Sequence, residues 1–362
     1  MRTIQMSSYT VGEDCFEAIP AVLAPYQAKT VVLVGGRRAL AAAAPGIRAA
    51  LDSANVQILD EIVYGTDSTQ SAIDALVANR AFRDADIAFA IGGGKAIDTV
   101  KTAAKELDKT VFSVPTICSN CSSATAIAVV YNDDHSLKGY AYPDAPVHIF
   151  INPAIIAAAP EEYFWAGIGD ALSKQPEVEY ATSEAELTHT GTLGLTLAHT
   201  CTDPLMAYGE QGLADVRVGQ SSEAVRQIAL DIVVNTGYVS NLTNQPDFYY
   251  NSSLAHAFYN ATTGVQRPGR THLHGEVVSF GVLVLFAYTG DTEQLARYAA
   301  FNKKLGLPVT LAELDLDESH LQRIAELAQN TNEWKQANPA PFSPEGFIEA
   351  IKAADAFGRN LK

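Results

Sequence analysis

Three residues in the second half of the sequence have the chemistry of a catalytic metal site. Asp170 ends the run Gly167-Ile-Gly-Asp170 at an expected helix start, His256 lies in an apolar helical stretch, and His274 precedes a second apolar stretch. One carboxylate and two imidazoles are a common ligand set for a catalytic divalent metal, which keeps a position for water or substrate. Because the histidines are far apart in the sequence, only tertiary structure brings them together, and His272 is an alternative to His274.

A triple glycine, Gly92-Gly93-Gly94, separates a predicted strand from a predicted helix. Glycines let backbone N–H groups approach a pyrophosphate closely, and the N-terminus of the following helix adds partial positive charge. The pattern is neither G-x-G-x-x-G nor a Walker loop. A tight turn without a ligand is the alternative, but the position at the carboxyl end of a parallel strand favours a dinucleotide.

The first predicted strand ends at Gly35-Gly36 and is followed by Arg37 and Arg38. NAD-binding sites commonly have an acid at this point, which accepts a hydrogen bond from the ribose 2′-hydroxyl. Two guanidinium groups suit a 2′-phosphate instead. The sequence therefore predicts at least tolerance of NADP(H), with solvated arginines at a helix start as the alternative.

Two of the four cysteines form a C-x-x-C pair, Cys118 and Cys121. Such a pair can be a thiol redox centre or half of a structural zinc site. The sequence has no second C-x-x-C, which excludes a zinc site made of two such pairs. Two interpretations are left for this pair: a loop that lines a ligand-binding site, and a thiol redox centre.

Strand and helix periodicities alternate through the first part of the chain and then give way to helical spacing. Strands are expected at 30–34, 57–63, 85–91, 110–114 and 147–151, a hairpin at 127–131 and 139–142, and helices at 39–51, 67–78 and 95–107. Helices are expected later at 184–206, 216–240, 293–305, 320–330 and 344–357. This order predicts an α/β nucleotide-binding domain over 1–158, with a doubly wound sheet, and an all-helical domain over 159–362.

Composition excludes several classes of partner. The 362 residues include 25 Lys+Arg and 41 Asp+Glu, a formal charge of −16 that would repel nucleic acids and anionic membranes. The longest apolar stretch, Val277–Tyr288, is shorter than the roughly 20 residues that a membrane span needs. With few cysteines and no secretory signal in the first residues, we expect a cytoplasmic protein with a small-molecule substrate. These features are compatible with a homo-oligomer.

The order of these motifs resembles the iron-containing alcohol dehydrogenase superfamily, and within it the glycerol dehydrogenase-like group. The matching segments are the glycine turn 92–98, the loop that starts at Pro115-Thr-Ile, Gly-Ile-Gly-Asp170, Ala-His256-Ala and His274-Gly-Glu. The resemblance implies a dehydroquinate synthase-like fold and hydride transfer between a nicotinamide dinucleotide, NAD(H) or NADP(H), and a small alcohol or carbonyl compound. It also implies one divalent ion, zinc or iron, held by Asp170, His256 and His274.

The predicted dinucleotide contacts combine the residues implied by this resemblance with the two glycine turns. They are Gly35, Arg37, Gly92, Gly93, Gly94, Lys95, Ala96, Ile97, Asp98, Thr116, Ile117, Cys118, Ser119, Thr125, Ile127 and Tyr131.

Two departures from the glycerol dehydrogenase pattern concern the substrate. Cys121 stands where glycerol dehydrogenases have a substrate-binding aspartate, so a carboxylate substrate would not be repelled there. Lys174 follows Asp170 by four residues, on the same face if one helix contains both. It could bind a substrate carboxylate, and the alternative is an ion pair with Asp170 or with a surface acid. These features resemble the hydroxycarboxylate dehydrogenase branch. We therefore expect Cys121 and Lys174 at the catalytic site and a 2-hydroxy acid/2-oxo acid substrate, with glycerol or another polyol as the alternative.

Further departures concern the surroundings of the metal. Pro176 is expected to kink the helix that carries Asp170, and Tyr259 stands where relatives often have a second histidine.

A lyase of the dehydroquinate synthase type is a further alternative, but it needs many basic residues for a phosphate and a carboxylate. The second half of the chain has few basic residues near the metal motifs, mainly Lys174, Arg267 and Arg270. This small number disfavours the lyase.

Overall fold

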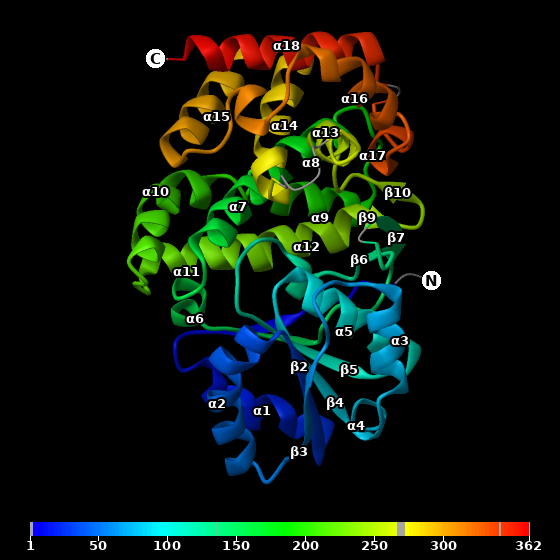
Figure 1. The fold of residues 1–362 in the computed structure, drawn as a ribbon, viewed down its shortest axis with the longest axis vertical. Coiled ribbons are helices and arrows are strands. Elements are labelled where there is room, and N and C mark those ends of the chain that lie inside the picture. The colour runs from blue at the N-terminus through cyan, green and yellow to red at the C-terminus, as the bar shows by residue number, and fades with distance from the viewer. Residues whose placement is uncertain (1–2, 135, 266–271, 340–341, 362) are drawn as a thin grey trace. The chain divides into compact units, whose positions relative to one another are not determined.

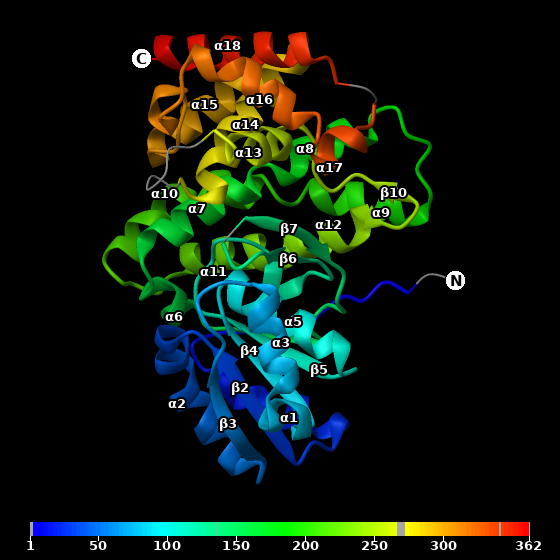
Figure 2. The same ribbon diagram turned by 45° about the vertical axis from the view of Figure 1, so that its right-hand side comes forward.

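The computed structural model describes residues 3–134, 136–265, 272–339 and 342–361, and these divide into two compact units (Figures 1 and 2). Unit 1 comprises residues 1–161 and 214–241, and unit 2 comprises residues 162–213 and 242–362. The expected boundary at residue 158 lies close to the end of the first stretch, and the segment 214–241 joins unit 1 as well. The predicted fold class, an α/β part followed by a helical part, is confirmed.

Unit 1 is built on a six-stranded parallel sheet in the order β1-β8-β5-β4-β2-β3. The strands are β1 (Ser8–Val11), β2 (Thr30–Gly35), β3 (Gln57–Val63), β4 (Ile87–Gly92), β5 (Thr110–Pro115) and β8 (His148–Ile151). All five strands expected from the apolar runs are present. Strand β1 was missed because its sequence, Ser-Tyr-Thr-Val, has no apolar run, and none of its residues is fully buried at this sheet edge.

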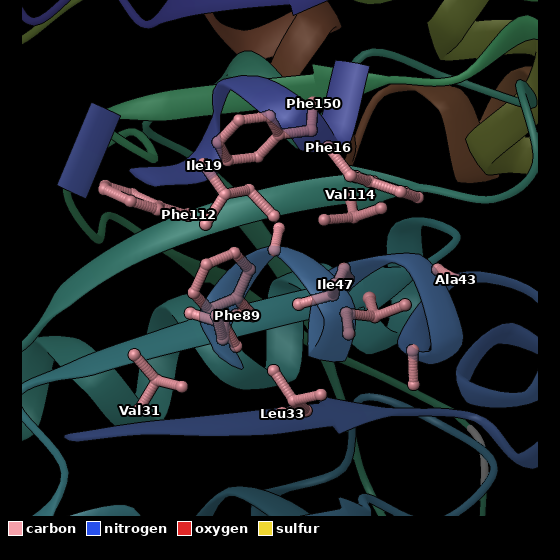
Figure 3. Close-up of a cluster of buried hydrophobic side chains, with 14 of the residues drawn as sticks. Phe16, Ile19, Val31, Leu33, Ala43, Ile47, Phe89, Phe112, Val114 and Phe150 are labelled. Atoms are coloured by element: carbon pink, nitrogen blue, oxygen red, sulfur yellow. The ribbon is translucent and has the colours of Figure 1, made fainter. Parts of the chain in front are cut away.

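Two layers of helices bury the faces of this sheet (Figure 1). Helices α1 (Ile19–Leu23) and α2 (Arg37–Ser53) cover one face, and α3 (Gln70–Ala78), α4 (Arg80–Asp84) and α5 (Gly94–Glu106) cover the other. On the first face, the rings of Phe89, Phe112 and Phe150 come from three adjacent strands and contact one another (Figure 3). This packed core holds the carboxyl ends of β2 and β4, and the turns that follow them, in fixed positions.

Two smaller features complete unit 1. The predicted hairpin is confirmed as the antiparallel pair β6 (Ala128–Tyr131) and β7 (Leu137–Ala141), which lies outside the main sheet. The chain returns to this unit as α11 (Glu223–Leu230), a π-helical turn (Asp231–Asn235) and the start of α12 (Thr236–Thr243). There Asn241 accepts a hydrogen bond from the backbone N–H of Ala126 and donates one to the carbonyl of Ala124. The return segment therefore supports the loop that precedes the hairpin.

Unit 2 is helical apart from a short hairpin of β9 (Asn244–Gln245) and β10 (Phe248–Tyr249). Helix α14 (His274–Thr289) is buried along nearly its whole length and packs against α13 (Leu254–Thr262), α15 (Thr292–Leu305) and α18 (Pro344–Asn360) (Figure 2). Its apolar sequence is therefore explained by its place in the core. None of the helices in the described part of the chain is long and apolar enough to cross a membrane.

The remaining helices complete the second half of the chain, where two of the expected helices are interrupted. The remaining helices are α7 (Glu161–Ala171), α8 (Lys174–Thr182), α9 (His189–Ala198), α10 (Asp203–Arg217), α16 (Leu321–Ala328) and α17 (Asn332–Lys335). The expected helix 184–206 is interrupted between α9 and α10, and the expected helix 216–240 is interrupted at 218–222, between the end of α10 and the start of α11. Both breaks lie where Ser and Thr offer side-chain hydrogen bonds that compete with the helix.

Candidate active site

Asp170, His256 and His274 converge within unit 2 although they come from three different helices. Asp170 lies in the last turn of α7, His256 in the first turn of α13, and His274 is the first residue of α14. The Nε2 atoms of His274 and His256 lie 3.0 Å and 3.6 Å from the same carboxylate oxygen of Asp170. Within the described residues this is the one group of at least three His, Cys, Asp or Glu side chains whose ligand atoms all lie within 4.8 Å of one another.

These donor atoms fit a divalent metal. Ligands that bind one zinc ion tetrahedrally, at 2.0–2.2 Å each, lie about 3.4 Å from one another, close to the two distances measured here. The imidazoles lower the pKa of Asp170 against the opposing effect of its burial. Asp170 therefore stays a carboxylate, the form that binds a cation. His272 is not part of this group, because its ring nitrogens face Glu276 and Asp315.

Glu177 is a part of this site that the sequence did not reveal. Its side chain is fully buried, and one oxygen lies 2.6 Å from Nδ1 of His256. The other oxygen accepts the backbone N–H groups of Ser253 and His256, at 2.7 Å and 3.0 Å. Burial alone would lower the pKa of His256, but Glu177 and Asp170 outweigh it and raise the pKa to about 10. Glu177 thus directs Nε2 of His256 toward Asp170.

Tyr259 lies one helical turn after His256 and forms a wall of the same site. Its ring meets the ring of His274 edge to face, with 4.1 Å between the ring centres. Burial and the nearby charge of Asp170 raise the pKa of the phenol, so its hydroxyl stays neutral. The tyrosine at this position therefore packs against a proposed ligand.

Two glycines allow the helices that carry Asp170 and His274 to touch. A Cβ atom on Gly275 would lie 1.8 Å from the carbonyl oxygen of Ala166, and one on Gly169 would lie 2.4 Å from the carbonyl oxygen of Gly275. Any side chain at either position would separate α7 from α14. These glycines, each next to a proposed ligand in the sequence, permit the close approach of the two helices.

The structure corrects three expectations about the segment after Asp170. Asp170 lies at the end of a helix and not at its start, and Lys174 begins the next helix, so the two do not share a helix face. Pro176 does not kink the helix, because it lies in the first turn of α8, where its missing N–H would have no intrahelical partner. Lys174 is buried, and its ammonium donates to the backbone carbonyl and the side-chain oxygen of Asn251, at 2.9 Å and 2.8 Å.

The glycine turn lies in unit 1 at the carboxyl end of β4, as expected. Helix α5 begins at Gly94, so the N–H groups of its first turn have no intrahelical partners. Cβ atoms on Gly93 and Gly94 would collide with the side chains of Ile117 and Asn120, at 2.3 Å and 2.7 Å. The turn and the loop after β5 therefore form one continuous surface, and it includes two segments predicted to bind the dinucleotide.

The other predicted dinucleotide residues of unit 1 differ in how they are placed. Arg37 begins α2 and is exposed, whereas Gly35 is buried where a Cβ would lie 2.3 Å from the carbonyl oxygen of Ile91. Lys95 forms an ion pair with Asp67 at 2.9 Å and lies over the ring of Tyr131. Residues whose side chains are largely or wholly removed from solvent are Ala96, Ile97, Asp98, Thr116, Cys118 and Thr125, and those that are half-buried are Ile117, Ser119 and Ile127.

The two cysteines of the C-x-x-C pair have different environments. Cys118 is buried, and this burial together with the charge of Asp231 raises the pKa of its thiol. Cys121 is half-buried, and neither cysteine is part of a disulfide. Because a thiolate is the reactive form in thiol exchange, a raised pKa at Cys118 disfavours the redox alternative.

Comparison with known proteins identifies metal-dependent dehydrogenases as relatives of this chain. Residues 10–160 match the family described as iron-containing alcohol dehydrogenase. A glycerol dehydrogenase from Thermotoga maritima is 31% identical over 311 residues, which cover 83% of this chain and 82% of that protein. Hydroxycarboxylate dehydrogenase A of Escherichia coli is 29% identical over 336 residues, 91% of each chain. The crystal structure of a probable glycerol dehydrogenase from Sinorhizobium meliloti has a TM-score of 0.85 at 26% identity, with 100% of both chains covered.

The fold, the group of ligand atoms and these similarities agree with one another. The chain belongs to the iron-containing alcohol dehydrogenase family, in its glycerol dehydrogenase-like group, and is an NAD(P)-dependent alcohol dehydrogenase that uses a divalent metal.

Proposed function

We propose that this enzyme interconverts small 2-hydroxy acids and 2-oxo acids, with Asp170, His256 and His274 as the metal ligands. The observation that carries the proposal is the convergence of these three side chains on one point, with 3.0 Å and 3.6 Å between the donor atoms. A divalent ion bound there, zinc or iron, would supply Lewis-acid polarisation of the substrate oxygen.

The remaining groups of the chain have distinct proposed roles. Glu177 holds the ring of His256, and Tyr259 packs against the ring of His274. In unit 1, the free N–H groups at the start of α5 would bind the pyrophosphate of the dinucleotide. The residues of the loop after β5, from Thr116 to Ile127, would contact the nicotinamide half, which the protein must orient toward the reacting carbon.

The proposed substrate class rests on Cys121. A thiol at this position neither repels a carboxylate nor accepts hydrogen bonds from a polyol as strongly as an aspartate would. Lys174 adds less support than its charge suggests, because two of its three N–H groups are already donated to Asn251. Only its third N–H is left for a substrate carboxylate.

A substrate panel tests the substrate class. Purified enzyme loaded with zinc or iron is assayed with 2-oxobutyrate-type acids, dihydroxyacetone and glycerol, each with both cofactors. We expect the oxo acids to give the highest kcat/KM. Cys121→Asp should shift this ratio toward the polyol, whereas Cys121→Asn, which matches the shape without the charge, should shift it less. Rapid glycerol oxidation with inert oxo acids would instead establish the polyol alternative, which the similarity to glycerol dehydrogenases favours.

The cofactor proposal concerns Arg37 and Arg38, which leave the carboxyl end of β2 without an acid. Gly36 precedes them in open space, so a 2′-phosphate could approach both guanidinium groups. We expect NADPH to be used at least as well as NADH, and Arg37→Ala with Arg38→Ala to raise the KM for NADPH selectively. A strong preference of the unaltered enzyme for NADH would contradict this assignment.

The lyase alternative receives little support from the residues. Of its candidate basic groups, Arg267 and Arg270 lie outside the described residues, and Lys174 is engaged by Asn251. The curated relatives compared above are named as dehydrogenases.

A further inference from the structure

A lysine ammonium is buried inside unit 1, in the middle of helix α5. The side chain of Lys101 is only 1% exposed. Its Nζ donates to the backbone carbonyls of Ser122, Thr125 and Ile127, at 2.9, 3.1 and 2.7 Å. A buried ammonium is costly unless its three N–H groups are satisfied and its charge is compensated. Here three carbonyls from a single loop satisfy the N–H groups.

Asp98, one turn earlier on the same helix, compensates the charge and binds the same loop. One of its carboxylate oxygens lies 3.0 Å from Nζ of Lys101 and accepts the hydroxyl of Ser122. The other oxygen accepts the backbone N–H of Val129 at 3.0 Å. Both oxygens are therefore used within the protein, although the sequence suggested that Asp98 contacts the dinucleotide.

The loop held in this way has little regular structure of its own. Between β5 and β6 it contains only a three-residue 3-10 turn, Ser122–Ala124, so its buried carbonyls need partners from elsewhere. A few residues before this turn, Ile117 and Asn120 rest on Gly93 and Gly94. The ion pair therefore fixes one end of a loop whose other end forms a common surface with the glycine turn.

We propose that Asp98 and Lys101 are positioning residues for the dinucleotide: they hold the loop after β5 in the form that binds the cofactor without touching the cofactor themselves. This inference rests on the proposed function of that loop. An ion pair needed only for folding could equally be replaced by apolar packing, whereas a positioning pair must affect cofactor affinity beyond its effect on stability.

Lys101→Met tests the role, because it keeps an unbranched side chain, one atom shorter than that of lysine, and removes the three N–H donors. NADH and NADPH affinities are measured by fluorescence titration, zinc affinity by competition with a chelator, and stability by thermal unfolding. We expect the dissociation constant of the better dinucleotide to rise about tenfold or more, because binding must then also order the loop. Zinc affinity should not change, and in the assay the KM for the dinucleotide should rise more than kcat falls.

A control and a second variant make the outcome decisive. Ile73→Ala removes a buried side chain of α3, in the core that α3 and α5 share, and should lower stability without changing dinucleotide affinity. Asp98→Asn exchanges the carboxylate for an amide of the same shape, and it is the variant to test if Lys101→Met does not fold. The proposal is wrong if the tested variant binds the dinucleotide as the unaltered protein does, or if Ile73→Ala weakens binding equally. Unaltered protein that binds zinc but neither dinucleotide would overturn the proposed function, and this role with it.

Discussion

Replacing Glu177 by glutamine should weaken metal binding although Glu177 is not a proposed ligand. The two backbone N–H groups of Ser253 and His256 both donate to one oxygen of Glu177, so the glutamine must place its carbonyl oxygen there. Its NH₂ group then faces Nδ1 of His256, which the carboxylate contacts at 2.6 Å. A metal binds only the neutral ring, and an amide NH₂ can only donate, so in the neutral ring of this variant Nδ1 must accept and the proton must lie on Nε2.

A protonated Nε2 cannot bind a metal, because ligation needs its lone pair. Metal binding would therefore have to restore the other tautomer and break the new hydrogen bond. In its metal-bound form the variant also lacks the hydrogen bond from Nδ1 to the charged carboxylate of Glu177, and such a bond contributes about 1.5–3 kcal/mol. We accordingly expect the E177Q variant to bind zinc about 10- to 100-fold more weakly, the range found when outer-shell partners of metal ligands are changed.

Competition with a fluorescent chelator, at neutral pH and in metal-free buffer, measures this affinity without reference to activity. Glu333→Gln is a matched control. Glu333 is also buried in unit 2, but it accepts hydrogen bonds from Asn260, Tyr249 and Ser252. Equal zinc affinities for E177Q and the unaltered protein would refute the reasoning, as would an equal loss in E333Q.

Three further changes should have measurable effects. Tyr259→Ala should weaken zinc binding about threefold to tenfold in the same titration, because an edge-to-face contact such as that with His274 contributes about 0.5–1.5 kcal/mol; Tyr259→Phe should not, and an unchanged Ala variant would contradict the packing role. Gly275→Ala should destabilise the protein by about 3 kcal/mol or more in chemical denaturation, since its Cβ would overlap a backbone oxygen; unchanged stability would show that α7 and α14 can separate freely. His148 is buried, which lowers its pKa from 6.5 to about 4. The unfolded chain therefore takes up the proton first, and stability should fall by about 2–3 kcal/mol as the pH drops from 6.5 to 4. His148→Gln should flatten this dependence, and an equally steep one would assign the acid sensitivity to other groups.

Five of the six strands of the sheet could be predicted because their sequences have a recognisable pattern. Buried parallel strands are continuous apolar runs, and β2 and β4 each end in glycine, where the chain must turn closely. Strand β1 has no such run, since it lies at the sheet edge and its pairing with β8 depends on residues about 140 positions away. The interruption between α9 and α10, by contrast, has a signal in the sequence that was overlooked: Pro204 lies in the first turn of α10, a place where proline is tolerated at the start of a helix but not in its interior.

The ligand-type residues could be predicted, whereas the residues that hold them could not. Asp170, His256 and His274 combine residue types with a recognised chemistry, although Asp170 ends a helix that it was expected to start. Glu177 and Lys101 are ordinary charged residues in helices, and such residues are normally at the surface. Their burial is decided by tertiary partners, the ring of His256 for Glu177 and a set of loop carbonyls for Lys101.

These two buried charges lead to different expectations for variants of the same enzyme. Glu177 acts on a proposed metal ligand within unit 2, and Lys101 acts on the proposed dinucleotide loop within unit 1. Since each charge is satisfied by groups of its own unit, loss of one should leave the other site intact. A Glu177 variant should thus bind the dinucleotide normally and the metal poorly, and a Lys101 variant the reverse. A variant that loses both affinities together would mean that the two sites are coupled through contacts other than these.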